Sequence, residues 1–204
     1  MTSTPAITAI PDSSKPFLSD VAALRERARQ HIEQGAVTPS YSANKQTVLN
    51  LLNEALATEL VCVLRYRRHY FMAEGLLAEA IKKEFLMHAQ EEQEHADKLA
   101  ERIVQLGGEP NFDPQGLTSR SHSEYKEGGD LNSMLEENLI AERVAIESYR
   151  EMINYIKDHD HTTRRILEHI LSVEEEHAEE LASMMKNLGT RPQARGNGPN
   201  SPRA

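Results

Sequence analysis

The feature that most constrains this chain is an acidic motif that occurs twice, on segments with the hydrophobic period of a helix. The pattern ExEHAxxL spans Glu92–Leu99 and again Glu174–Leu181. In each copy a Glu and a His stand three residues apart, so both side chains project from one face of a helix. Like-charged glutamates at one-turn spacing destabilise a helix by about 0.2–0.5 kcal/mol per pair. The motif therefore requires either a bound cation or a strongly solvated face.

A further glutamate precedes each copy by almost the same distance. Glu59 lies 33 residues before Glu92, and Glu142 lies 32 residues before Glu174. Each interrupts an apolar stripe at helical spacing. The stripe residues are Leu52, Leu56, Val63 and Tyr66 around the first, and Leu135, Leu139, Ile146 and Tyr149 around the second. Both glutamates should face the protein interior, where an ionised carboxylate needs a partner.

Four glutamates and two histidines in this order match the ligand set of di-iron and di-manganese carboxylate bundles. Four carboxylates balance the charge of two divalent cations, whereas in an empty apolar core they would repel one another and take up protons. Oxygen donors with imidazole suit iron or manganese and leave positions for oxygen or peroxide. The candidate ligands are Glu59, Glu92, His95, Glu142, Glu174 and His177. A single Glu-x-x-His is common on solvated helices, but solvation does not explain two copies matched to two embedded glutamates.

Three other side chains accompany this set. Tyr66 and Tyr149 each follow an embedded glutamate by seven residues. Each either packs in the core with a hydrogen-bonded hydroxyl or acts beside the metal centre, including in its redox chemistry. His88 lies on the helix face of Glu92 and is interpreted as a structural residue or an outer donor rather than a ligand. The other histidines lack such embedding and are interpreted as surface or packing residues.

Helical periodicity covers the chain from about residue 18 to residue 188. A short amphipathic helix is expected over residues 18–34, followed by long helices over about 44–74, 76–106, 130–158 and 162–188. The connection of about twenty residues before Asp130 is long enough to cross a bundle. The predicted fold is all-α: one domain over residues 17–188, a four-helix bundle with a long crossover between its second and third helices. Residues 1–16 and 189–204 are rich in Pro, Gly, Ser and Thr and are predicted to be disordered tails.

Charge and cysteine content narrow the class of protein. The net charge of −9 argues against a nucleic-acid-binding body and suits a protein that attracts cations. Cys62 is the only cysteine, which excludes intramolecular disulfides and cysteine-rich metal sites and favours a reducing compartment. No apolar run approaches the roughly 20 residues of a membrane helix, and the N-terminus does not resemble a signal peptide. We expect a soluble cytoplasmic protein.

Four segments resemble the ferritin-like superfamily, most closely bacterioferritins and Dps-like mini-ferritins with a bacterioferritin-type centre. These segments are ALATELVCVLRY, EEQEHADKLAERIVQLGGEPN, MLEENLIAERVAI and EEEHAEEL. The resemblance spans about residues 44–188 and implies that the six candidate ligands bind two iron ions, with Glu92 and Glu174 bridging. Manganese and zinc are other possible occupants. Tyr66 matches a tyrosine near that centre. The implied function is a ferroxidase that oxidises Fe(II) with oxygen or hydrogen peroxide and stores the ferric mineral in a hollow shell.

The chain departs from bacterioferritin at two places. Gln93 occupies the position of the methionine that ligates haem, so haem is not expected. The large shells of 24 subunits have a short fifth helix, whereas a Gly/Pro/Arg tail follows Leu188 here. The second departure favours a homo-oligomer of twelve subunits over one of 24.

Two other functions remain open from the sequence. A Dps-like protectant would bind DNA through the tail arginines, which are Arg191, Arg195 and Arg203. With +3 on that tail the rest of the chain carries −12, which predicts weak DNA binding or none. A non-storage di-metal enzyme, such as a manganese catalase, would use the same six ligands.

We predict that the protein purifies without haem when it is expressed with haem available. The reason is that Gln93 offers an amide where an axial thioether is needed. Absorption spectroscopy is the measurement. A Soret band of stoichiometric intensity would show that another residue ligates haem.

Overall fold

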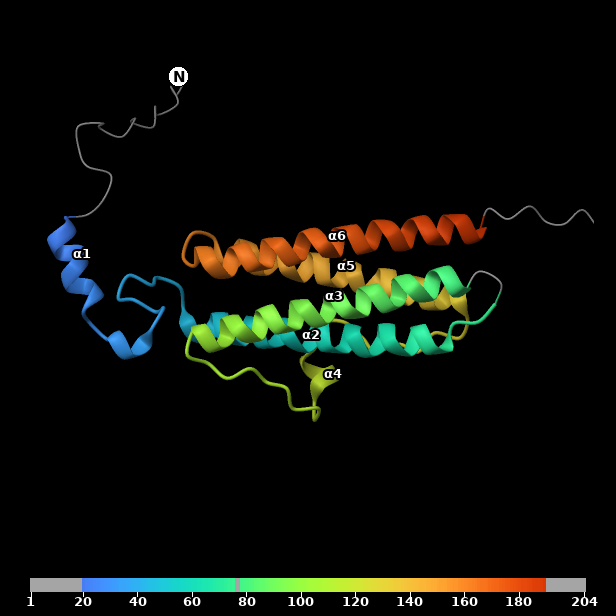
Figure 1. Ribbon diagram of the computed structural model, residues 1–204, viewed down its shortest axis with the longest axis horizontal. Coiled ribbons are helices and arrows are strands. Elements are labelled where there is room, and N and C mark those ends of the chain that lie inside the picture. The colour runs from blue at the N-terminus through green and yellow to red at the C-terminus, as the bar shows by residue number, and fades with distance from the viewer. Residues whose placement is uncertain (1–19, 76–77, 190–204) are drawn as a thin grey trace, which may run out of the picture. The chain divides into compact units, whose positions relative to one another are not determined.

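The computed structural model describes residues 20–75 and 78–189, and within these ranges it contains helices and no strand. The described residues before Ser42 form one compact unit and those from Ser42 onward form another. The second unit is a bundle of four long helices (Figure 1), which are α2 (Lys45–Met72), α3 (Ala78–Gln105), α5 (Leu131–Ile156) and α6 (His161–Gly189). The predicted all-α bundle is confirmed. The predicted tails, including the three tail arginines, lie outside the described residues, except Gly189 at the end of α6.

The N-terminal unit contains α1 (Val21–Ala28) and a 3-10 turn, η1 (Ile32–Gln34). The Asp20 side chain begins α1 by accepting a hydrogen bond from the backbone N–H of Ala22 at 2.7 Å. The helix predicted over residues 18–34 is therefore interrupted, because His31 has a φ of 52°, in the left-handed region. No residue of α1 or η1 is buried, so no packed face supports a longer helix.

Capping residues account for the ends of the bundle helices. Asn44 begins α2 by accepting a hydrogen bond from the N–H of Thr47 at 3.1 Å, and Asp130 begins α5 in a capping box with Ser133. Gly107, which follows α3, has a φ of 73°, a conformation that suits glycine. The long helices begin and end within about two residues of their predicted bounds. The predicted start of the second one, at residue 76, lies outside the described residues.

The four helices form two hairpins, α2 with α3 and α5 with α6, and the hairpins pack so that α2 lies beside α5 and α3 beside α6. The crossover from α3 to α5 includes the short helix α4 (Leu117–Arg120) and runs along the bundle to its opposite end (Figure 1). Neighbouring helices are therefore antiparallel throughout, as the length of the crossover predicted.

Buried polar side chains hold the crossover against the bundle. Arg65 of α2 is fully buried, and its guanidinium donates to Asn138 Oδ1 at 2.8 Å and to the carbonyl of Glu124 at 3.2 Å. His69, also fully buried, places Nε2 3.0 Å from the carbonyl of Glu127. These contacts satisfy backbone groups of the crossover that would otherwise lack partners.

The helix α2 is a core helix. Among the described helices it is the one long and apolar enough to cross a bilayer, but most of its apolar window is buried inside the bundle. Its Leu52 and Leu56 are fully buried, and each such side chain contributes about 1.5–3 kcal/mol to folding. It also carries Glu59 and Arg65 on buried positions, where other helices supply their partners.

The junction between α5 and α6 contains a buried ion pair whose loss we expect to destabilise the bundle. The Asp160 carboxylate accepts from Arg102 Nη2 at 2.9 and 3.0 Å and from the N–H of Thr163 at 2.9 Å. Asp160→Ala leaves a buried guanidinium unpaired, so the free energy of unfolding should fall by about 3–5 kcal/mol in chemical denaturation. The matched control, Asp158→Ala, removes an exposed pair with Arg164 and should cost under about 1 kcal/mol. Equal losses in the two variants would contradict this assignment.

Candidate metal centre

The six predicted ligand residues meet in the interior of the bundle. They are Glu59 from α2, Glu92 and His95 from α3, Glu142 from α5, and Glu174 and His177 from α6. Each is exposed by 2% or less. Helical spacing explains this convergence, because each embedded glutamate and each Glu-x-x-His pair occupies the inward face of its helix.

The ligand atoms form two overlapping groups, and within each group all atoms lie within 4.8 Å of one another. The first group contains Glu59, Glu92, His95 and Glu174, and the second contains Glu92, Glu142, Glu174 and His177. Glu92 and Glu174 belong to both groups. Two metal ions could therefore lie side by side with two carboxylates between them.

Each imidazole presents Nδ1 to three carboxylates. His95 Nδ1 lies 2.9, 3.2 and 3.7 Å from oxygens of Glu174, Glu92 and Glu59. His177 Nδ1 lies 3.6, 3.7 and 3.9 Å from oxygens of Glu174, Glu92 and Glu142. The same ring nitrogen of each histidine is thus available to one metal position.

Five buried atoms of this set make no hydrogen bond of acceptable geometry, although Glu174 Oε1 lies at ion-pair distance from His95 Nδ1. They are Glu92 Oε1, Glu142 Oε2, both carboxylate oxygens of Glu174, and His177 Nδ1. A buried polar atom without a partner costs about 1–3 kcal/mol, and such atoms are rare. All five face into the two groups, so the donor set fits a pair of cations better than it fits an empty core.

The two tyrosines bond the outer carboxylates reciprocally. Tyr66 Oη donates to Glu142 Oε1, and Tyr149 Oη donates to Glu59 Oε1. Each tyrosine therefore bonds the glutamate of the other helix, because α2 and α5 are antiparallel. Both rings are buried in the core with a bonded hydroxyl, and both orient a carboxylate of the candidate centre.

Burial and mutual repulsion disfavour the charged form of the outer carboxylates. Burial, followed by the charge of Glu92, raises the pKa of Glu59 to about 8. Burial and the charges of Glu92 and Glu174 also raise the pKa of Glu142 well above its usual value. Without a metal ion, both groups therefore tend to retain a proton.

The imidazoles and the shared carboxylate Glu92 behave in the opposite way. Burial by itself would lower the pKa of His95, but contacts with the carboxylates of Glu174, Glu59 and Glu92 raise it to about 12. The pKa of His177 is raised to about 12 for the same kind of reason. Burial by itself would raise the pKa of Glu92, but contacts with His177 and His95 outweigh burial and lower this pKa well below its usual value. Protons thus supply, in the metal-free centre, positive charge that cations would otherwise provide.

The sequence analysis did not predict Glu91 as a neighbour of the centre, and it predicted the role of His88 only in part. Glu91 Oε2 lies 2.9 Å from His177 Nε2, so Nε2 can donate to Glu91 while Nδ1 faces the carboxylates of the centre. The only sequence signal for Glu91 is its adjacency to Glu92. His88, expected to be structural or an outer donor, is fully buried and belongs to neither group of ligand atoms, but its ring stacks on that of His177 at 4.0 Å.

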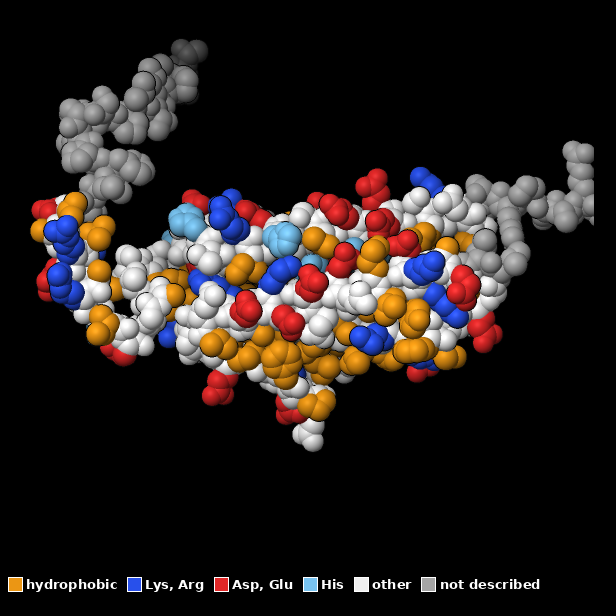
Figure 2. All heavy atoms as spheres, viewed as in Figure 1, with side chains coloured by type: hydrophobic (Ala, Val, Ile, Leu, Met, Phe, Trp, Pro, Cys, Tyr) orange, Lys and Arg blue, Asp and Glu red, His pale blue; other side chains and the backbone are white. Residues whose placement is uncertain are grey.

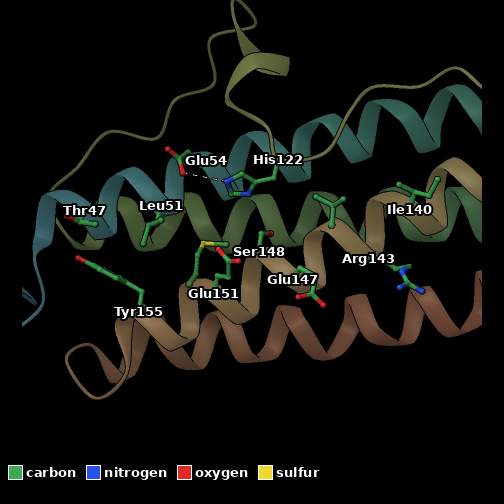
Figure 3. A pocket seen from close by; sticks show the side chains of 12 residues that line it. Thr47, Leu51, Glu54, His122, Ile140, Arg143, Glu147, Ser148, Glu151 and Tyr155 are labelled. Atoms are coloured by element: carbon green, nitrogen blue, oxygen red, sulfur yellow. Dashed lines mark ion pairs between the residues drawn. The ribbon is translucent and has the colours of Figure 1, made fainter.

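The candidate centre lies apart from a groove on the surface of the bundle. A groove of about 840 Å³ lies between α2 and α5 (Figure 3), lined by apolar side chains such as Leu51, Ile140 and Tyr155, with Glu54 and His122 forming an ion pair beside it. None of the six candidate ligands lines this groove. The groove is therefore separate from the candidate ligands, each of which is buried inside the bundle.

Comparison with known proteins shows what this chain is similar to. The chain is 29% identical over 149 residues to a bacterioferritin of Desulfovibrio desulfuricans, which covers 71% of this chain and 79% of the relative. It is 31% identical over 137 residues to a nutrient stress-induced DNA-binding protein of a Synechococcus species, which covers 66% and 78%. A solved structure of a bacterioferritin-related protein from Bacteroides fragilis, described as a dodecameric thioferritin, aligns with a TM-score of 0.70 and 32% identity, over 72% of this chain and 89% of the other.

The family match covers the bundle and the candidate centre together. The ferritin-like domain family matches residues 49–190, which is more than half of the chain and includes all six candidate ligands. The chain belongs to the ferritin-like family.

Proposed function

We propose that this protein is a ferroxidase that oxidises Fe(II) at a centre within each subunit and stores the ferric product. The observation that carries the proposal is the pair of ligand groups that share Glu92 and Glu174, with five buried atoms lacking hydrogen bonds. Membership of the ferritin-like family and the similarity to bacterioferritins support iron as the metal.

The donor set suits two Fe(II) ions bound as substrate. One ion would contact His95 and Glu59, the other would contact His177 and Glu142, and Glu92 and Glu174 would bridge them. Four carboxylates balance the charge of two divalent cations, and oxygen donors with imidazole suit iron, although manganese and zinc are compatible with the same set. Two Fe(II) ions release two electrons, which with two protons reduce oxygen to hydrogen peroxide or hydrogen peroxide to water.

The residues of the chain would also handle protons as the ions bind. Ligands must be deprotonated to coordinate a metal ion, so binding displaces the protons held at Glu59, Glu142 and the two imidazoles. Tyr66 and Tyr149 each occupy one oxygen of an outer carboxylate, which leaves the other oxygen for metal. The role proposed for Tyr66 is to orient Glu142 in this way.

We further propose that the protein assembles into a homo-oligomeric shell, with twelve subunits preferred over 24. Large apolar side chains of α2 are at least half exposed, including Leu64, Phe71 and Met72. Figure 2 shows hydrophobic side chains gathered along the edge of the bundle where α2 lies. Such a surface is typical of a protein interface. The mass of the assembly, measured together with iron loading, would distinguish a storage shell from a non-storage di-metal enzyme.

Loss of one imidazole should impair the chemistry of the centre. His95→Ala and His177→Ala each remove a nitrogen ligand, so the initial rate of Fe(II) oxidation should fall by about tenfold or more in stopped-flow absorbance. His169→Ala is the matched control, since His169 is exposed on α6 and contacts Lys98 rather than the centre. Wild-type rates in both centre variants would refute the ligand assignment.

The stability of the metal-free protein should fall as pH rises from about 6.5 to about 8, above the range in which the lowered pKa of His69 acts in the opposite direction. Glu59 loses its proton near 4.5 in the unfolded chain but near 8 in the folded protein, so the folded state binds more protons in this window and is stabilised less at higher pH. The two imidazoles act in the same direction above 6.5, because their folded pKa is raised to about 12. Chemical denaturation in the presence of a chelator measures the slope.

Two variants and one metal ion test the origin of that slope. Glu59→Gln should flatten the pH dependence, whereas Glu54→Gln, an exposed glutamate on the same helix, should leave it unchanged. Zn(II), which is redox-inert, should stabilise wild type more as pH rises, because it replaces the displaced protons. Parallel slopes in wild type and Glu59→Gln would show that this carboxyl does not hold a proton in the folded protein.

A further inference from the structure

The last part of the crossover, residues 123–128, lies between α2 and α5. On the α2 side, Arg65 and His69 bond its carbonyls at 3.2 and 3.0 Å. On the α5 side, the carbonyl of Ala141 accepts a hydrogen bond from it at 3.4 Å, and Met134 lies against the glycine at its end. One end of the space between these two helices is thus filled by the chain itself.

The two halves of the bundle assign each of these positions a counterpart. Corresponding residues of α2 and α5 are 83 apart in the sequence, as the two embedded glutamates show. The counterparts of Arg65, His69 and Met134 are therefore Ser148, Met152 and Leu51. All three counterparts line the groove of about 840 Å³ between α2 and α5 (Figure 3). The groove is thus the counterpart of the space that the crossover fills, and no segment of the described chain fills it.

The chain just before α2 does not enter this groove. Ser42 Oγ lies 3.1 Å from His159 Nδ1, at the junction between α5 and α6. No described residue before Thr47 lines the groove. The other segment that corresponds to the crossover is residues 190–204, which follow α6 as the crossover follows α3.

The internal repeat of the sequence continues from the helices into this C-terminal segment. The residues LGGEP, 106–110, end α3 and begin the crossover, and the residues LGTRP, 188–192, follow 82 positions later. The same offset of 82 separates the two Glu-x-x-His pairs. The chain therefore leaves α3 and α6 through similar sequences.

Residues 190–204 are long enough to reach and cross the groove. Because α5 and α6 are antiparallel, Gly189 ends α6 at the end of the bundle where α5 begins (Figure 1). Measured along α5 from Leu131, the groove begins at Ile140, about 14 Å away, and ends at Tyr155, about 36 Å away. An extended chain of 15 residues spans about 50 Å.

The composition of residues 190–204 complements that of the groove. The charged side chains of α2 and α5 that line the groove are three glutamates and one arginine, namely Glu54, Glu147, Glu151 and Arg143. Residues 190–204 contain three arginines and no acidic residue. They also contain three prolines, which favour the extended conformation that docks into grooves with exposed aromatic side chains.

We propose that residues 190–204 dock into the groove between α2 and α5 of the same chain, with arginines toward the groove glutamates. The segment covers Ile140 and Tyr155, which are 49% and 51% exposed to solvent in its absence. Arginines engaged in this way are withdrawn from DNA. The proposal does not depend on metal chemistry, because none of the six candidate ligands lines the groove.

A photo-crosslinker in the groove identifies what occupies it. Tyr155 is replaced by p-benzoylphenylalanine in the full-length chain, and the purified protein is irradiated at about 0.15 M salt, which screens weak surface contacts. Mass spectrometry should identify crosslinks to residues 190–204, in a product that keeps the mass of one chain on a denaturing gel. The control position is Asn154, which is exposed on the same helix but does not line the groove, and which should give no such crosslink.

Two pairs of substitutions test the role of charge in the protein with the crosslinker at Tyr155. Glu147→Gln with Glu151→Gln should reduce the yield of crosslinks to residues 190–204 by about threefold, because two exposed ion pairs are lost. Glu176→Gln with Glu179→Gln, which changes two exposed glutamates of α6, should leave the yield unchanged.

Three results would overturn the proposal. Crosslinks to residues 1–19 would show that the N-terminal segment occupies the groove, and a product with the mass of two chains would show that a second copy does. An unchanged yield in the groove variant would refute the pairing of arginines with the groove glutamates. None of these results bears on the six candidate ligands, so the proposed ferroxidase centre would stand.

Discussion

The mutual repulsion of four buried carboxylates is the constraint on which the structure depends. Two like charges about 4 Å apart repel by about 4 kcal/mol at an effective dielectric constant of 20. Glu92 and Glu174 approach both His95 and His177, and the outer two carboxylates each accept a tyrosine hydroxyl. Protons on the imidazoles and outer carboxyls moderate the repulsion until cations replace them. A core of this kind keeps the carboxylates that the chemistry needs, and their repulsion lowers the stability of the folded protein.

The helical framework holds these groups in place because the ligands lie on long helices and not on loops. Each helix supplies its ligands from one buried face, with apolar residues one turn on either side. Two buried arginines, Arg65 and Arg102, stabilise the framework, one against the crossover and one at the start of α6. Each guanidinium is held by hydrogen bonds to its partners, because a buried guanidinium needs an ion pair or hydrogen bonds.

The bundle consists of two similar halves. The residues that the halves share supply the candidate ligands, and the residues that differ lie beside the centre. Both halves contain an embedded glutamate, a tyrosine seven residues later, and a Glu-x-x-His pair. Antiparallel packing of α2 and α5 turns this repeat into a reciprocal exchange of tyrosine–glutamate hydrogen bonds. The halves differ around His88, where α6 has Ile170, and at Glu91, where α6 has Val173. The polar residues beside the centre are therefore concentrated on the side of His177.

The sequence by itself determined the four long helices and the six residues that meet in the core, because hydrophobic periodicity and motif spacing are local properties of a helix. Only the tertiary structure decided which faces meet. It showed the contact of Glu91 with His177, the exchange of partners between Tyr66 and Tyr149, and the stacking of His88 on His177. It also showed the interruption of the N-terminal helix at His31, where no packed face supports it. Periodicity assigns a residue to one face of its own helix, whereas contacts between helices depend on the axial register and rotation at which they pack, which no local pattern specifies.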